Sequence, residues 1–211
     1  MSDDANPRLR DRARTEATIL AAARDVLAQT GFQGFGVNAV ARQAGCDKQL
    51  IYRYFGGLEG LVDAMGAELA LRLEASLDAG PTVAAPTYAA FAEHLLLRFL
   101  DSFRDDVLVQ RIAAWEISDA SPLVARLSRA RGAAMLQWMA RARGDLVAPA
   151  GVDAPALNAV LIAAAQQLVL ASSAMGGFSG VALQSGQDWD RIRAAFVRLV
   201  RSSYAEPAPD A

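Results

Sequence analysis

The chain has 211 residues, of which 53% are hydrophobic, and its formal net charge at pH 7 is -2. This length accommodates a small domain beside a larger one, and the composition supplies ample apolar material for a core. The single cysteine, Cys46, excludes an internal disulfide and a zinc site built from several cysteines, and it suits the reducing cytosol. We therefore predict a cytoplasmic protein, in which Cys46 is either an apolar filler or a redox-sensing thiol.

The charge is distributed unevenly along the chain. Residues 8–57 carry eight Arg or Lys against four acids, whereas residues 58–211 carry 13 against 17. A basic N-terminal part on an acidic body is expected of a DNA-binding protein, because DNA affinity depends on the local basic footprint. The alternative is that this uneven distribution of charge arose by chance among a small number of charged residues.

Residues 1–14 are predicted to be a flexible basic arm, because arginines alternate with other residues from Arg8 to Arg14. Such an arm can lie along phosphates or enter a minor groove, and a solvated tail is the alternative. The segment is charged rather than apolar, so no signal peptide is predicted. A first helix is expected over Thr15–Gln29, where Ile19 and Val26 belong to its inner face.

Two short helices are predicted within residues 36–55. The first follows from apolar residues at i, i+3, i+4 and i+7, which are Val37, Val40, Ala41 and Ala44. Gly45 is expected to end it in the left-handed conformation, and Asp47 to cap the second helix.

The second helix has two unlike sides. Ile51 and Phe55, four residues apart, form its apolar back, and the front is polar, cationic and aromatic. Two short helices joined by a tight glycine-containing turn indicate a helix-turn-helix, whose second helix enters the DNA major groove.

The run from Ala44 to Phe55, AGCDKQLIYRYF, resembles the signature of TetR-type one-component regulators, which commonly reads A-G-V-S-K-G-T-L-Y-H-Y-F. The resemblance covers roughly residues 15–65. Three residues depart from the pattern: Gly36 replaces a Ser or Thr cap, Leu50 a polar residue, and Leu58 a phosphate-binding Lys. These departures concern individual contacts rather than the motif.

The front of the second helix has the chemistry for DNA recognition. Arg53 can fork onto guanine and Gln49 can pair with adenine, while Lys48 and Tyr54 can hold phosphates. The predicted DNA-binding residues, of which Leu50 would touch a thymine methyl group, are Lys48, Gln49, Leu50, Tyr52, Arg53 and Tyr54.

The body, residues 58–204, is predicted to be entirely helical and to follow the DNA-binding domain of residues 15–57. A long helix over Leu58–Leu77 is the natural lever between the two parts, and a proline-containing loop follows at residues 80–86. Further helices are expected over Thr87–Phe103, Asp106–Ser118, residues 122–143, residues 153–176 and Asp188–Tyr204. With no useful strand pattern, the fold class is all-α, and residues 205–211 are predicted to be a disordered tail.

Bulky, soft or polar residues on the body helices suggest a pocket for a small apolar or aromatic ligand. The candidate lining residues are Phe91, His94, Trp115, Met135, Trp138, Met139 and Gln166. Core packing is the alternative for each residue, and His94 could also be a partly exposed side chain beside Arg98.

The last two helices, about 155–175 and 188–204, are predicted to form a homodimer. The resemblance implies a four-helix bundle, in which small residues between 163 and 174 allow close approach and Trp189 and Phe196 supply buried area. The stretch from Ala154 to Gln187 is uncharged, so a membrane span is the alternative. Its amides and serines disfavour insertion, and we predict no membrane.

No catalytic, metal-binding or cofactor motif is visible, so we predict neither an enzyme nor a cofactor. The sequence predicts a ligand-responsive regulator, a repressor by resemblance, that binds double-stranded DNA at a palindromic operator as a dimer. The alternatives are a small-molecule enzyme and a helical binding protein whose helix-turn-helix no longer contacts DNA.

Overall fold

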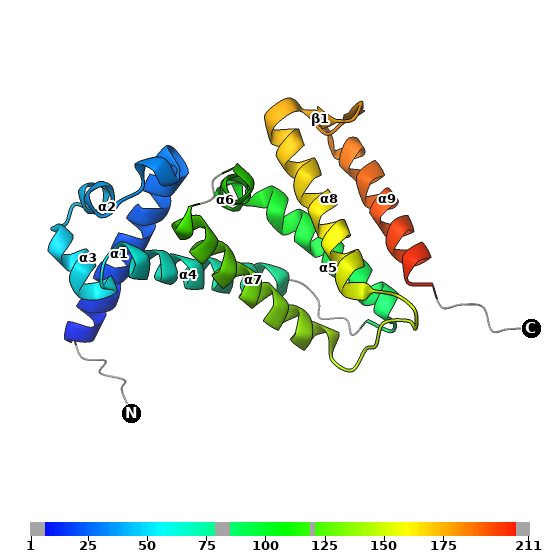
Figure 1. The fold of residues 1–211 in the computed structure, drawn as a ribbon, viewed down its shortest axis with the longest axis horizontal. Helices are drawn as coiled ribbons and strands as arrows, with labels where there is room; N and C mark the ends of the chain where they lie inside the picture. The colour runs from blue at the N-terminus through cyan, green and yellow to red at the C-terminus, as the bar shows by residue number, and fades with distance from the viewer. Residues whose placement is uncertain (1–6, 79–84, 119–120, 206–211) are drawn as a thin grey trace, which may run out of the picture. The chain divides into compact units, whose positions relative to one another are not determined.

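The computed structural model describes residues 7–78, 85–118 and 121–205, and these residues are overwhelmingly helical (Figure 1). The all-α prediction is confirmed. Residues 1–6 of the predicted arm, most of the predicted loop at 80–86 and residues 206–211 of the predicted tail lie outside the described residues.

The helices lie close to their predicted positions. They are α1 (Pro7–Thr30), a short 3-10 helix (Phe32–Gly34), α2 (Val37–Ala44), α3 (Lys48–Phe55), α4 (Leu58–Asp78), α5 (Tyr88–Asp105), α6 (Val107–Ser118), α7 (Pro122–Arg143), α8 (Ala154–Met175) and α9 (Gly186–Ser203).

The chain divides into two compact units. The first unit comprises Met1–Arg72 with Ala114–Ala134, and the second comprises Leu73–Ala113 with Met135–Ala211. Three helices, α4, α6 and α7, therefore begin in one unit and end in the other. The predicted domain boundary at residue 57 stays a prediction, because these units are defined by contacts rather than by function.

The first unit is built around α1, which packs against α2. Its core residues, all buried, include Ile19 of α1, Val40 of α2, Ile51 of α3 and Met65 of α4. Apolar side chains at helical spacing thus converge from several short elements on one centre, as their burial requires.

The start of α1 differs from the prediction. The helix begins at Pro7, so residues 7–14, expected to belong to a flexible arm, are instead its first two turns. Proline is favoured in the first helical position, where its missing N–H is not needed. Arg12 also pairs with Glu16 one turn later at 2.9 Å, which favours helix over coil.

The second unit is organised on α5, which packs against both α8 and α9. Leu100 of α5, Val169 of α8 and Val200 of α9 belong to one buried cluster. Trp189 and Phe196 lie in this cluster too, with exposures of 5% and 4%. The expectation that they supply area for a partner subunit was therefore wrong, because the period of α9 turns them into the chain's own core.

A short β-hairpin joins α8 to α9, although no strand was predicted from the sequence. β1 (Gly177–Phe178) pairs antiparallel with β2 (Val181–Ala182). The two residues between them, Ser179 and Gly180, both have positive φ, at 49° and 80°. Two such residues give the turn twist that suits adjacent antiparallel strands.

α8 is long and apolar enough to cross a membrane, judged by length and composition alone within the described residues. That criterion is also met by core helices. Here Leu161, Ala165 and Val169 lie in the core of the second unit. The composition of α8 thus has a packing explanation on its inner side.

α8 and α9 are tied together at both ends. The Tyr204 hydroxyl donates a hydrogen bond to Asn158 Oδ1 at 2.9 Å, and the Ser172 hydroxyl donates one to the Leu183 carbonyl at 2.7 Å. Figure 1 shows the two helices lying side by side. They therefore form one block.

Tyr204 makes this block sensitive to alkaline pH. Burial raises the pKa of Tyr204 to about 12, from an ordinary value of 10.0. The unfolded chain loses this proton at lower pH than the folded chain, so the contribution of Tyr204 to stability is complete below pH 10 and is lost as the pH rises towards 12. We expect the free energy of unfolding, measured in urea, to fall more steeply over this range in the natural protein than in Tyr204→Phe. Equal slopes for the two proteins would contradict this assignment.

Candidate nucleic-acid interface and ligand-binding residues

The turn between α2 and α3 has the predicted geometry. Gly45 adopts the left-handed conformation, with φ 64°, and its N–H donates to the Ala41 and Arg42 carbonyls. The Asp47 side chain accepts a hydrogen bond from the Gln49 N–H at 2.7 Å, which caps α3. The two helices are thus held in a helix-turn-helix by their own end residues.

α3 turns one side inward and presents the other to solvent. Ile51 is fully buried, whereas Tyr52 is 55% exposed. Three further predicted DNA-binding residues are exposed, namely Lys48, Gln49 and Arg53. The other two, Leu50 and Tyr54, are half-buried, as is Phe55 on the back of the helix.

An additional cation lies beside α3 and was not singled out from the sequence. The Arg12 guanidinium of α1 lies 5.6 Å from the centre of the Tyr54 ring, and the Arg53 guanidinium lies 6.0 Å from it. Tyr54 therefore links two cations from different helices. The basic composition of the arm indicated charge here, but its helical conformation was needed to place Arg12.

Cys46 lies in the turn and is half-buried. Burial, and to a smaller extent the charge of Asp47, raises the pKa of the Cys46 thiol. A raised pKa leaves less of the reactive thiolate at neutral pH. The environment thus favours the filler interpretation over the redox one.

The predicted ligand-binding residues do not all lie together. Phe91 and Trp138 are buried in the core cluster of the second unit, and Met135 and Met139 pack against that cluster. The Trp138 Nε1 donates to Asp78 Oδ1 at 2.7 Å, at the end of α4. Four of the seven residues thus share one apolar region.

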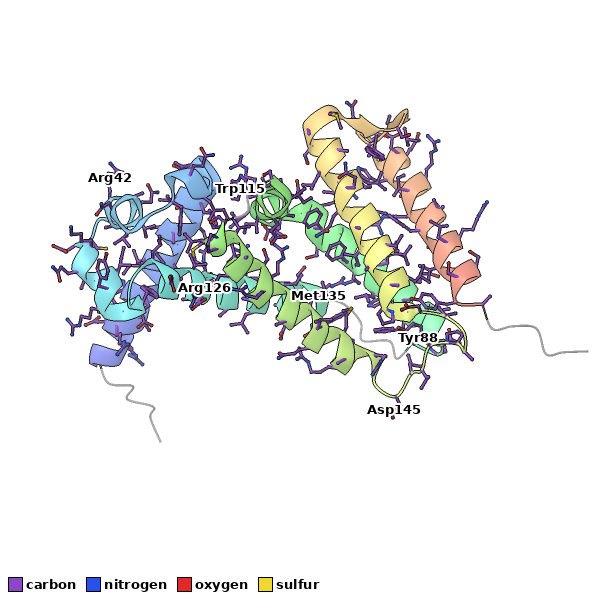
Figure 2. The ribbon with its side chains drawn as sticks, in the orientation of Figure 1. Arg42, Tyr88, Trp115, Arg126, Met135 and Asp145 are labelled. Atoms are coloured by element: carbon purple, nitrogen blue, oxygen red, sulfur yellow. The ribbon has the colours of Figure 1, made fainter. Side chains whose placement is uncertain are left out.

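The other three occupy different surroundings. Trp115 lies in the first unit, where its ring meets Phe32 edge-on at 5.5 Å and contacts Gly31 (Figure 2 marks Trp115). His94 is exposed on α5, and Gln166 is half-buried on α8. Periodicity assigned these residues to helix faces but could not assign the neighbours of each face.

Across residues 7–78, 85–118 and 121–205, no three His, Cys, Asp or Glu side chains gather in a group that could hold a metal ion.

This fold and this exposed, capped helix define a helix-turn-helix DNA-binding protein. Residues 19–65 match the family model described as bacterial regulatory proteins, tetR family. Residues 19–65 therefore form a DNA-binding domain of the TetR type, and TetR-family proteins are transcriptional regulators rather than enzymes.

Three similar proteins are each described as a transcriptional regulator. The HTH-type transcriptional regulator AlkX of Mycobacterium tuberculosis is 29% identical over 147 residues, which cover 64% of this chain and 68% of AlkX. A TetR-family regulator from Marinobacter aquaeolei has a similar structure, with a TM-score of 0.59, 18% identity, and coverage of 95% of this chain and 100% of its own. FadR from Bacillus subtilis, in complex with stearoyl-CoA, has a TM-score of 0.59, 17% identity, and coverage of 89% and 98%.

Proposed function

We propose that the protein is a dimeric repressor that binds a palindromic operator and is released from it by a small apolar or aromatic ligand. The observation that carries the DNA-binding part is the exposed front of α3, with Lys48, Gln49 and Arg53 in solvent and Ile51 buried behind them. A helix held from behind in this way can present hydrogen-bonding side chains to base edges without losing its packing. A cytoplasmic location is consistent with this role.

The outward side of α8 and α9 supports dimerisation. Val160 of α8 is 65% exposed and Leu199 of α9 is 52% exposed. Small residues surround them on the exposed faces, namely Ala156, Ala159, Ala163, Ala194 and Ala195. Small side chains allow helices to approach closely, and an apolar strip of this kind gains stability when a second copy covers it. Since a two-fold dimer carries two copies of α3, its half-sites should lie about 34 to 36 Å apart or a multiple of that.

An apolar ligand is supported by the region around Phe91, Met135, Trp138 and Met139. FadR, a protein of the same fold, binds stearoyl-CoA, whose acyl chain is apolar. Trp138 also touches Asp78 in the last turn of α4. Because α4 begins in the first unit, a ligand beside Trp138 could act on the DNA-binding domain through this helix. To shift the ratio of two protein conformations from about 1:99 to 99:1, the ligand must bind one conformation more tightly than the other by roughly 5.5 kcal/mol.

A gel-shift assay with palindromes from the neighbouring promoter tests the proposal. We expect a saturable shift that a scrambled duplex of equal length does not give. Compounds that raise the melting temperature in a screen of apolar molecules, stearoyl-CoA among them, should then release the operator. A protein that shifts no palindrome at low salt would not be a repressor of this promoter, and ligands that stabilise the protein but leave the shift intact would contradict induction.

A further inference from the structure

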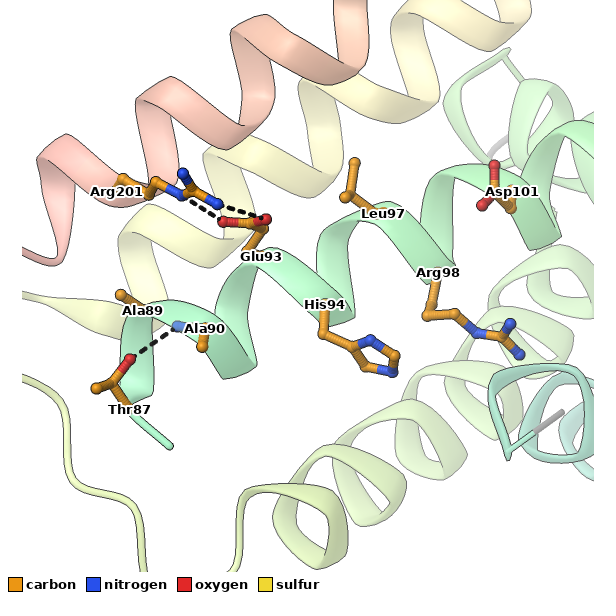
Figure 3. Close-up of a pocket in the computed structure, with 9 residues that line it drawn as sticks. All are labelled: Thr87, Ala89, Ala90, Glu93, His94, Leu97, Arg98, Asp101 and Arg201. Atoms are coloured by element: carbon orange, nitrogen blue, oxygen red, sulfur yellow. Dashed lines mark hydrogen bonds and ion pairs between the residues drawn. The ribbon is translucent and has the colours of Figure 1, made fainter. Parts of the chain in front are cut away.

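A groove of about 410 Å³ runs along the exposed face of α5, outside the apolar core cluster (Figure 3). Thr87, the N-cap of α5, lines it together with Ala90 and Leu97 of α5, and Arg201 of α9 forms one edge. The volume is in the range of a small-molecule site rather than that of a single water or ion. It lies entirely within the second unit.

The two carboxylates of the groove are already neutralised. Glu93 accepts two hydrogen bonds from Arg201, at 2.8 and 3.2 Å, and Asp101 is paired with Arg193. Arg193 does not line the groove, so the lining itself carries two guanidinium groups, those of Arg98 and Arg201, and two carboxylates. Arg98 is paired with neither carboxylate, because its bonds go to backbone carbonyls, so its charge is available to an anion.

His94 and Arg98 lie four residues apart on α5, and Figure 3 shows their side chains extending from the same side of the helix. Arg98 Nη2 donates to the carbonyls of Ser76 and Leu77, in the last turn of α4. Those bonds fix the guanidinium and leave its other N–H groups for a ligand. Within the described part of the chain, the His94 imidazole has no hydrogen-bond partner.

We propose that this groove is a second ligand site, specific for a small organic acid. The carboxylate would bind between His94 and Arg98, and the apolar part would lie on Ala90 and Leu97. Arginine suits this role because its planar donors match a carboxylate, and imidazole adds a donor beside it. The site differs in chemistry and in lining from the apolar region around Trp138, and it does not depend on DNA binding.

His94 gives the test a direct readout, because it is the chain's single histidine. In protein labelled with ¹⁵N-histidine, we expect sodium octanoate to shift the imidazole resonances saturably. Octanol and octylamine, of the same chain length without the anion, should leave them in place. An equal shift with octanol would show apolar binding only, and no saturable shift with octanoate would overturn the proposal.

A pair of variants at Ala90 locates the site while preserving the fold. The Ala90 N–H donates a hydrogen bond to Thr87 Oγ1, which caps α5. Position 90 is therefore the one where Glu or Gln completes a capping box. Ala90→Glu and Ala90→Gln should therefore both fold, with similar side-chain volumes. We expect Ala90→Glu to bind octanoate at least about tenfold more weakly than Ala90→Gln, because like charges repel in the groove.

Equal octanoate affinity in the two Ala90 variants would contradict an anion site in the groove. Operator binding by both variants, measured without octanoate, should match that of the natural protein. If the natural protein does not bind the operator, the proposed function is contradicted but the octanoate result is unaffected. The two proposals therefore fail separately.

Discussion

Replacing Ala163 with arginine is expected to convert the protein from a dimer to a monomer and to weaken operator binding by about 100-fold or more. Ala163 is exposed in the middle of the uncharged outer side of α8. In a bundle of closely packed small residues, an arginine there would be crowded and would bury a charge without a partner. A monomer then binds one half-site and loses the gain from two linked contacts. Analytical ultracentrifugation and fluorescence anisotropy on the same samples measure both effects.

The matched control is Ala133→Arg on α7, which adds the same charge at another exposed helical alanine. It should remain dimeric and keep its operator affinity, apart from a small non-specific gain from the added cation. Circular dichroism should show the same helix content in both variants. A dimeric Ala163→Arg protein, or a monomeric natural protein, would exclude the outer side of α8 as the interface.

Helix positions and core faces could be predicted because both depend on local spacing. Ile51, Trp189 and Val200 are buried because apolar residues at helical period must share one face. The ends of helices could be predicted where a capping residue was recognised, as Asp47 was at the start of α3. The start of α9 was placed two residues late because the pairing of Ser185 with Asp188, a capping box visible in the sequence, was not used.

The partners of each face could not be predicted, because periodicity says nothing about which elements meet. Trp115 and Trp138 are both tryptophans at apolar positions of a helix. Trp115 nevertheless packs on Phe32 in the first unit, whereas Trp138 lies in the core of the second unit. His94 and Phe91, three residues apart, were both predicted to line the ligand pocket. In the structure Phe91 is on the buried side of α5, whereas His94 is on its exposed side. Contacts of this kind are settled by tertiary packing alone.

Arg53→Ala is expected to weaken specific operator binding by about 1 to 3 kcal/mol and to relax the base preference at one position of each half-site. Arg53 is exposed on the front of α3, and its guanidinium lies 6.0 Å from the Tyr54 ring centre. A fork of two donors onto guanine is lost entirely on truncation to alanine. Arg53→Lys keeps the charge but not the fork, so it should recover affinity for non-specific DNA while leaving the base preference relaxed. Anisotropy on the operator and on single-base variants separates these effects.

Lys48→Ala gives the contrasting outcome, because a lysine at the start of α3 suits a phosphate rather than a base. It should weaken binding about equally for all sequences and reduce the dependence of log affinity on log salt concentration by about one unit. Arg53→Ala changes sequence preference in addition to affinity, so the two variants distinguish base contact from phosphate contact on adjacent turns of one helix. If Arg53→Ala left both affinity and preference unchanged, base recognition would have to be reassigned to Gln49 and Tyr52, two further exposed residues of that front that can donate or accept at a base edge.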